Sequence, residues 1–278
     1  MATDRRRNQA SLVPDANPLA FVVSEQDKQT ITMVEAALRE KRLRLAYQPV
    51  MLSADPQRVA FYEGLIRVLD ESGRVIPARD FMGAVETQDL GRRIDCAALE
   101  LGFQTLAKHS DIRLSVNMSA RSIGYPQWMR TLKQGLELSP AIGERLILEI
   151  TESSAMLVPE LVTAFMDDLQ RAGVAFALDD FGAGYTAFRY FKDFFFDVIK
   201  IDGQFIRNIH RDGDNQVLTR ALLSIARQFE MFTVAESVET IEEAEFLRGI
   251  GVDCLQGYLF GAPTLHPAFL SESERRRA

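Results

Sequence analysis

The chain has 278 residues with a formal net charge of -7, and 47% of its residues are hydrophobic while 26% are charged. This balance argues against a disordered chain and against tight binding to DNA or RNA. No segment approaches the roughly 20 apolar residues of a membrane helix, and the two cysteines, Cys96 and Cys254, stand far apart. We therefore expect a cytoplasmic protein with no membrane association, no disulfide framework and no zinc site.

Composition along the chain predicts one domain between two irregular ends. Residues 1–23 are polar and basic with two prolines, and they predict a mobile N-terminal arm. Residues 24–270 contain no Gly/Ser-rich linker and predict a single domain, and residues 271–278 predict a frayed tail. The first helix is expected to begin at Ser24, which could cap it, with Asp27 completing a pattern similar to a capping box.

After this helix, short apolar runs alternate with longer amphipathic stretches, as in βα units that build a parallel sheet. The runs are Leu45–Tyr47, Val59–Tyr62, Ile112–Val116, Leu146–Ile150, Val174–Leu178, Val198–Ile201, Phe232–Ala235 and Val252–Leu255. Their number predicts an α/β fold of the TIM-like (βα)8 barrel type. The connection between the first two runs is too short for a helix, which predicts an antiparallel strand near the start.

Nearly every run ends on a carboxylate, an amide or a lysine. These residues are Glu63, Asn117, Glu149, Glu152, Asp179, Asp180, Lys200, Asp202 and Glu236. Because the carboxyl ends of barrel strands share one mouth, the side chains should converge there. Several carboxylates in one place raise one another's pKa unless cations screen them, and oxygen-only ligands favour Mg²⁺ or Mn²⁺.

Each of these acidic residues also has an ordinary structural explanation. A single carboxylate after a strand is usually a helix N-cap, and Asp179-Asp180 before Gly182 fits turn chemistry. Five independent caps, all at strand ends, are less plausible than one shared site. This pattern leaves both interpretations open.

The same residues lie in segments through which the chain resembles the EAL-domain cyclic di-GMP phosphodiesterases, from about Arg44 to Pro263. The segments are YQPV, EGLIR, SVNMS, LEITES, LDDFGAGYTAF, IKIDG, VAESVET and LQGYLFGAP. They appear in the family's order and with its approximate spacing. Together they are specific, whereas any one alone would not be.

The resemblance implies a role for each matching residue. The implied ligands of two Mg²⁺ or Mn²⁺ ions are Glu63, Asn117, Glu149, Asp179, Asp180 and Glu236, with Asp179 bridging. Lys200 and Glu236 are the implied catalytic residues, together with Glu152, which would hold the loop 181–185. The implied dinucleotide contacts are Gln48, Leu65, Arg67 and Gln256. The implied reaction is hydrolysis of cyclic di-GMP to linear pGpG, and Ca²⁺ is expected to inhibit it.

Two positions depart from the family pattern. Gly64 stands where the eponymous motif has Ala, and Ser237 stands where Gly is usual. If that second position needs a positive φ, Ser there costs roughly 1–2 kcal/mol. Neither change removes an implied metal ligand.

Three functions therefore compete: an active hydrolase, a cyclic di-GMP sensor that binds without turnover, and an interaction protein that ignores nucleotides. The retained Lys200, Asp180 and Glu236 favour the hydrolase, since binding alone needs no second metal. Gln48 and Arg67 argue against the third function. The family's mode of dimerisation and the aromatic run Phe188–Phe196 predict a homodimer.

Overall fold

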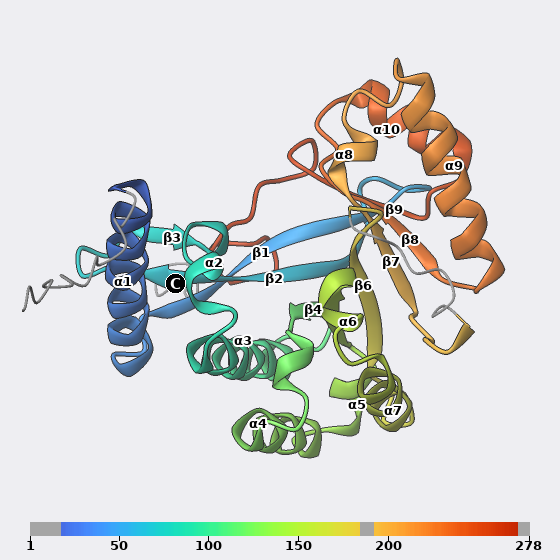
Figure 1. Cartoon of the computed structure of the whole chain (residues 1–278). Coiled ribbons are helices and arrows are strands. Elements are labelled where there is room, and N and C mark those ends of the chain that lie inside the picture. Colours follow the sequence, from blue (N-terminus) through green and yellow to red (C-terminus); the bar gives the residue numbers. More distant parts are fainter. Residues whose placement is uncertain (1–17, 184–191, 272–278) are drawn as a thin grey trace, which may run out of the picture.

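The computed structural model describes residues 18–183 and 192–271, and its element arrangement is shown in Figure 1. Residues 1–17 of the predicted arm, residues 184–191 and residues 272–278 of the predicted tail lie outside these ranges, whereas residues 18–23 of the predicted arm are helical. The first helix, α1 (Pro18–Arg39), begins six residues before the predicted start at Ser24. Proline is well suited to a first helical position, because its φ is already helical and its missing N–H is not needed there.

The sheet closes into the predicted barrel, and β1 is its antiparallel strand (Figure 1). The strands are β1 (Leu43–Leu52), β2 (Val59–Leu69), β4 (Leu114–Asn117), β5 (Leu146–Thr151), β6 (Ala175–Phe181), β7 (Val198–Ile201), β8 (Phe232–Ala235) and β9 (Cys254–Gln256). From β2 and β4 onward, neighbouring strands are parallel as far as β9, and β1 pairs antiparallel with both β9 and β2. A short strand that the sequence did not predict, β3 (Val75–Pro77), pairs antiparallel with β2 outside the barrel.

Helices surround the barrel and follow most of its strands. They are α2 (Met82–Val85), α3 (Asp89–Lys108), α4 (Pro126–Glu137), α5 (Pro140–Gly143), α6 (Glu152–Ala155), α7 (Pro159–Gln170), α8 (Gly203–Ile206), α9 (Gly213–Gln228) and α10 (Ile241–Ile250), with 3-10 turns at Ala78–Asp80 and Ala120–Ser122. Their ends follow local chemistry. Asp212 accepts hydrogen bonds from two backbone N–H groups at the start of α9, and Gly251 closes α10 with a φ of 82°.

The main core packs the helices against the outside of the barrel and includes fully buried Trp128, Phe176 and Phe181. A smaller cluster, containing Val50, Ala177 and Val234, fills the barrel interior beneath the mouth. Because both layers are dense and apolar, the strand ends have little freedom to move. The barrel therefore holds the polar side chains at its mouth on a rigid frame.

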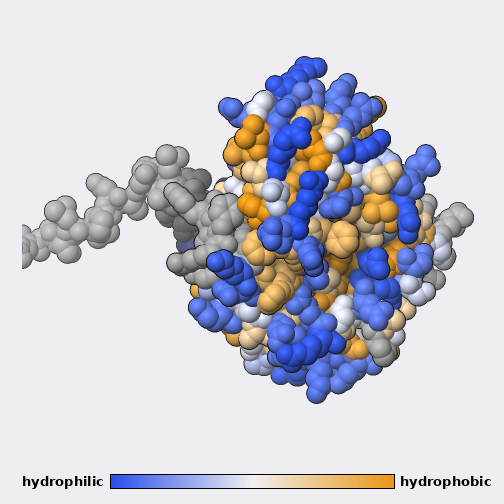
Figure 2. All heavy atoms as spheres, turned by 90° about the vertical axis from the view of Figure 1, so that its right-hand side faces the viewer, coloured by the Kyte–Doolittle hydropathy of each residue, from blue (hydrophilic) through white to orange (hydrophobic). Residues whose placement is uncertain are grey.

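On the surface, hydrophobic side chains lie between charged ones over the face on the α9 side (Figure 2). Within the aromatic run implicated in dimerisation, Phe194 and Phe196 are buried and Phe195 is 67% exposed, while residues 188–191 lie outside the described ranges. The homodimer stays a prediction. No helix in the described part of the chain is both long and apolar enough to cross a membrane.

Candidate active site

Strand register brings the predicted residues together at the barrel mouth. Gln48 of β1 lies opposite Glu63 of β2, and Asn117 of β4 lies beside Glu149 of β5. Thr151 of β5 pairs with Asp179 of β6. Since the parallel strands all end at the same rim, residues more than a hundred positions apart in sequence become neighbours.

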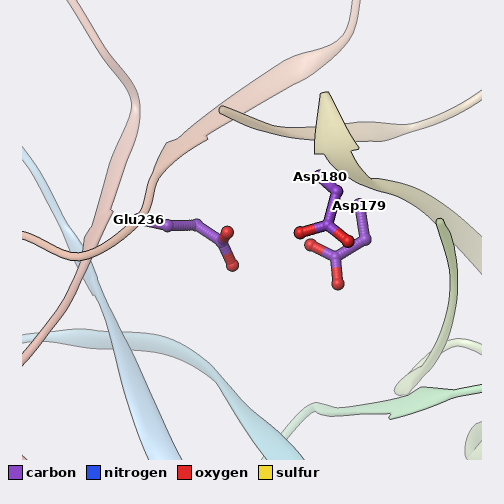
Figure 3. A group of neighbouring side chains, drawn as sticks. All are labelled: Asp179, Asp180 and Glu236. Carbon is purple, nitrogen blue, oxygen red and sulfur yellow. The ribbon is translucent and has the colours of Figure 1, made fainter. Parts of the chain in front are cut away.

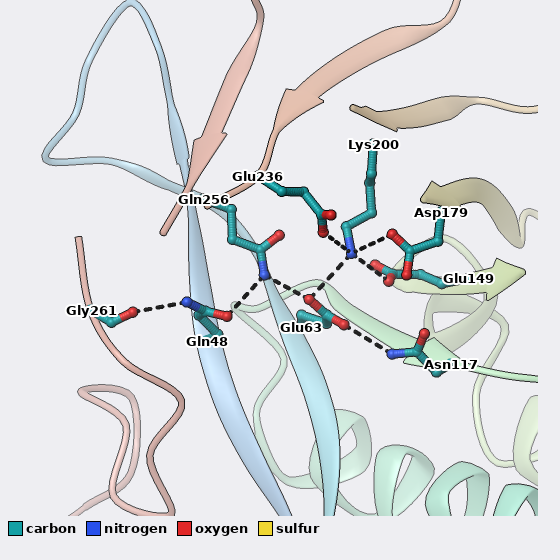
Figure 4. Close-up of polar contacts among 9 residues, drawn as sticks. All are labelled: Gln48, Glu63, Asn117, Glu149, Asp179, Lys200, Glu236, Gln256 and Gly261. Atoms are coloured by element: carbon teal, nitrogen blue, oxygen red, sulfur yellow. Dashed lines mark hydrogen bonds and ion pairs between the residues drawn. The ribbon is translucent and has the colours of Figure 1, made fainter. Parts of the chain in front are cut away.

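Lys200 is the centre of this cluster (Figure 4). Its side chain is only 1% exposed, and its Nζ lies 2.8 Å from Glu236 Oε1 and 2.9 Å from Glu149 Oε2. The same Nζ lies 3.1 Å from Asp179 Oδ1 and 3.3 Å from Glu63 Oε2. Although burial alone would lower it, these four carboxylates raise the pKa of Lys200 well above its ordinary value. Lys200 is therefore a fixed positive charge.

A chain of amide hydrogen bonds fixes Glu63 (Figure 4). Gln256 Nε2 donates to Glu63 Oε2 at 2.6 Å and to Gln48 Oε1 at 3.1 Å, and Gln48 Nε2 donates to the Gly261 carbonyl at 3.1 Å. Asn117 Nδ2 donates to Glu63 Oε1 at 2.9 Å, which leaves its amide oxygen as the possible ligand atom. Burial would raise the pKa of Glu63, but Lys200 and these amides hold it below its usual value.

Three other carboxylates of the cluster, those of Glu236, Asp180 and Glu149, have raised pKa values. Burial, reinforced by Asp179 and Glu63, raises the pKa of Glu236 to about 8 despite Lys200. Burial and the Asp179 charge raise the pKa of Asp180 to about 6. Glu149, which is fully buried, has a pKa raised well above its usual value by burial and by the Glu63 charge. The cluster therefore needs more positive charge than Lys200 supplies.

Divalent cations fit this need. Asp179, Asp180 and Glu236 each offer an oxygen, with all three oxygens within 4.8 Å of one another, and their carboxylates converge between β6 and β8 (Figure 3). All six predicted ligands are oxygen donors, which suit Mg²⁺ or Mn²⁺. Together they carry five carboxylates, Glu63, Glu149, Asp179, Asp180 and Glu236, against the single charge of Lys200. The donor set therefore fits a pair of hard cations.

A break in β6 allows adjacent aspartates to face the same site. Residues that follow one another in a strand normally point to opposite faces. The register of β6 against β7 shifts between Leu178 and Phe181, and Asp180 adopts a φ of 56°. This irregularity turns the Asp180 carboxylate toward Asp179, as a β-bulge does.

Glu152 lies at the start of α6, directly after β5. Its side chain is 3% exposed, and its Oε2 accepts a hydrogen bond from the Gly182 backbone N–H at 3.2 Å. Glu152 thus contacts the loop that it was predicted to hold, although residues 184 and 185 lie outside the described ranges. Its effect on catalysis stays a prediction.

Two cavities meet at the cluster, and Glu63, Leu65, Asp179 and Asp180 line both of them. The larger, of about 720 Å³, extends between β2, α2 and α3, and the smaller, of about 280 Å³, extends toward β8 and β9. The predicted substrate residues Gln48 and Gln256 line the smaller cavity. Predicted Arg67 lines neither; it lies half-buried on β2, close enough to Glu63 to interact with its charge.

Sequence reasoning missed several polar residues of these cavities. The larger is also lined by Asp95, Arg79 and Arg121, and the smaller by Arg207, Glu239 and Tyr258. Asp95 could have been found, because it lies between Gly91 and Ala98 on the buried face of α3, where a charged residue is unusual. Glu239 belongs to the VAESVET segment but was given no role.

The buried carboxylate of Asp95 should make the stability of the fold depend on pH. Its Oδ2 accepts hydrogen bonds from Ser122 Oγ at 2.6 Å and Ser119 N at 3.0 Å, yet burial raises its pKa from 3.8 to about 6. Because the pKa of Asp95 is raised in the folded state, its contribution to the free energy of unfolding is fully present below pH 3.8. That contribution is lost as the pH rises through about 6. Asp95→Asn keeps an oxygen acceptor without ionising. We expect the free energy of unfolding of Asp95→Asn, relative to the parent, to rise by up to about 3 kcal/mol between pH 4 and 7.

Urea denaturation at both pH values measures this difference, and all other titrating groups cancel because both proteins contain them. A difference that stays constant from pH 4 to 7 would contradict the raised pKa of Asp95. Asp168→Asn, at an exposed position on α7, provides a matched control for the removal of a surface carboxylate.

Ser237 predicts a second stability effect. Its φ is 57°, so this position does adopt the left-handed conformation that favours glycine. Ser there costs about 1–2 kcal/mol, while Gly loses about 0.4–1 kcal/mol more backbone entropy on folding. We expect Ser237→Gly to raise the free energy of unfolding by about 0.5–1 kcal/mol, measured by urea denaturation.

Ser224→Gly, at an exposed position in the interior of helix α9, is the control for this substitution. It should lower the free energy of unfolding by about 0.3–0.5 kcal/mol, because glycine is less favourable than serine within a helix. Equal losses at both positions would show that the left-handed backbone at Ser237 is not strained.

Comparison with known proteins identifies the family of this chain. The EAL domain model matches residues 31–263, so the chain belongs to the EAL domain family. Among curated proteins, it is 29% identical to the cyclic di-GMP phosphodiesterase PdeB of Shewanella oneidensis over 88% of this chain, and 29% identical to NbdA of Pseudomonas aeruginosa over 87%. The chain spans only about a third of these relatives, 29% of PdeB and 32% of NbdA.

Solved structures agree with this assignment. The phosphodiesterase PaMucR in complex with c-di-GMP matches with a TM-score of 0.74 at 30% identity, over 86% of this chain and 98% of that one. The FimX EAL domain from Pseudomonas aeruginosa, bound to c-di-GMP, matches in fold with a TM-score of 0.77 at 24% identity, over 85% and 96% of the two chains.

Proposed function

We propose that this chain is a metal-dependent phosphodiesterase that hydrolyses cyclic di-GMP to linear pGpG. The observation that carries the proposal is the position of the carboxylate–lysine cluster, which lies where the two cavities meet. A cyclic dinucleotide has two nucleosides joined by phosphodiesters. With one nucleoside in each cavity, a phosphodiester would lie against Asp179 and Asp180.

The chain's own residues supply binding, orientation and charge. The larger cavity offers buried Asp95, whose carboxylate suits the N–H donors of a guanine edge. Lys200, held by four carboxylates, adds positive charge where negative charge develops on the phosphate. Two bound cations would lower the pKa of a water and stabilise the departing 3′ oxygen. The water adds across the P–O3′ bond, which yields a 5′-phosphate and a 3′-hydroxyl.

The ligand set supports hydrolysis over binding alone. Glu236 and Asp180 converge with Asp179 and could hold a second cation, which binding without turnover does not require. The raised pKa values of Glu236 and Asp180 mean that cation binding would displace protons from them, so metal affinity should increase with pH. The alternative is a sensor that binds cyclic di-GMP without turnover. An assay with different metal ions distinguishes it from the enzyme.

We expect the purified chain to convert cyclic di-GMP to pGpG with Mg²⁺ or Mn²⁺, and to bind but not cleave it with Ca²⁺. Ca²⁺ prefers longer bonds and more ligands, so at these carboxylates it would hold a water in a different position from Mg²⁺ or Mn²⁺. An error near 1 Å costs about 100-fold in rate. Calorimetry with each metal, beside chromatography of the products, measures both properties.

The outcomes separate the three functions. A sensor would bind cyclic di-GMP with all three metals and cleave it with none, and an interaction protein would not bind it. Tight binding without pGpG under Mg²⁺ and Mn²⁺ would refute the hydrolase and direct attention to Gly64 and Ser237.

A further inference from the structure

Arg207 is a cation of the smaller cavity that the sequence did not single out. It follows α8, its side chain is exposed, and it lines the cavity beside Glu236 and Glu239. Within residues 18–183 and 192–271, its guanidinium forms no hydrogen bond or ion pair. Lys200, by contrast, is buried and already neutralised by four carboxylates. Of these two cations, Arg207 is the one that no carboxylate of the described residues pairs with.

The backbone that carries Arg207 is held by a buried carboxylate outside the cavity. Glu243 is 3% exposed, and its Oε1 accepts a hydrogen bond from Asn208 N at 2.7 Å. Its Oε2 accepts from Glu239 N at 2.8 Å and Thr240 N at 3.0 Å. Burial would raise the pKa of Glu243, but these backbone donors lower it, so the group stays ionised.

Glu243 therefore ties together two turns of the cavity wall. One turn contains Arg207 and Asn208, and Asn208 has a φ of 59°, a left-handed conformation that asparagine tolerates. The other turn contains Glu239 and begins α10 through the capping box of Thr240 and Glu243. Loss of the Glu243 charge would release both turns at once.

The charge of the cavity decides what Arg207 can bind. Asp180, Glu236 and Glu239 make the wall acidic, which repels an anionic substrate. Cyclic di-GMP carries two phosphodiesters, and only one of them can lie at the metal-binding carboxylates. The second has to be accommodated away from the cations, and an unpaired guanidinium is suited to it.

We propose that Arg207 binds the phosphodiester that is not cut, and that Glu243 is the positioning residue that holds Arg207 in place. This inference rests on the proposed function, since it assumes that cyclic di-GMP is the substrate. Arg207 contributes to binding of both the ground state and the transition state. Its loss therefore affects KM and Kd, whereas kcat stays nearly unchanged.

The test compares Arg207→Gln with Arg207→Lys and with Arg211→Gln. Arg211 is also exposed and lies four residues further along the chain, so Arg211→Gln is the matched control. We expect Arg207→Gln to raise KM with Mg²⁺, and Kd for cyclic di-GMP with Ca²⁺, by about tenfold, because an exposed charge-assisted hydrogen bond is lost. Arg207→Lys keeps the charge and should raise both by only about threefold. In Arg211→Gln, both constants should match those of the parent.

Glu243 is tested by a double-mutant cycle. Glu243→Gln should raise KM by about threefold in the parent background and should raise it no further in Arg207→Gln, because both changes remove the same contact. A purely structural role would lower thermal stability and kcat equally in both backgrounds. KM is measured at a temperature where circular dichroism shows each variant to be folded.

The outcomes also distinguish this inference from the proposed function. A parent chain that neither binds nor cleaves cyclic di-GMP refutes the proposed function and, with it, this inference. An active parent whose Arg207→Gln variant has the same KM and Kd as Arg211→Gln overturns the role of Arg207 alone. Additive effects of Arg207→Gln and Glu243→Gln on KM overturn the positioning role of Glu243.

Discussion

Asp179→Asn is expected to lower turnover of cyclic di-GMP by at least about 100-fold while the protein stays folded. Asp179 belongs to the oxygen triad with Asp180 and Glu236, and it is the residue predicted to bridge two cations. An amide keeps the size of the side chain but donates on one side, so it is a poor bridging ligand. Product chromatography under Mg²⁺ measures the loss.

Stability should respond to Asp179→Asn in the opposite sense from activity. Asp179 adds repulsion to Glu149 and Glu236, and Lys200 retains three other carboxylates after the substitution. The melting temperature without metal should therefore be unchanged or higher. Asp168→Asn on the surface should leave turnover intact. Near-normal turnover in a well-folded Asp179→Asn protein would remove the two-metal assignment.

Lys200→Met is expected to lower the free energy of unfolding by about 3–5 kcal/mol in the presence of a chelator. Its ammonium is buried within 3.3 Å of four carboxylates, and methionine would leave these groups without a compensating charge. Mg²⁺ should restore part of the loss, because a cation that binds only the folded state stabilises it. Urea denaturation with and without Mg²⁺ measures both effects.

The control is Lys133→Met on α4, where the lysine is 79% exposed and lies 3.9 Å from Glu137. Its loss should change the free energy of unfolding by less than about 1 kcal/mol, with no dependence on Mg²⁺. If Lys200→Met is as stable as the parent in chelator, the four carboxylates do not depend on Lys200, and the charge argument for cations fails.

The alternation of apolar runs and helical stretches was sufficient to predict the barrel. All eight predicted runs overlap barrel strands, because buried parallel strands require continuous apolar residues whatever their neighbours. The antiparallel start also followed from local chain length, since no helix fits between residues 52 and 59. The start of α1 was missed, because Ser24 offered a good cap while Pro18 is equally compatible with a first helical turn.

Residue types at strand ends determined which side chains could form the site, but tertiary structure decided how they meet. No local pattern shows that Lys200 contacts four carboxylates, since these contacts depend on the closure and register of strands distant in sequence. The β6 irregularity that turns Asp180 toward Asp179 depends on pairing with β7. Arg207 and Asp95 enter the cavities through turns and helix packing. Local sequence patterns were sufficient to predict the strands and the chemistry of the donor groups, because both depend on residue type and spacing. The geometry of the site depends on contacts between residues distant in sequence, which no local pattern contains.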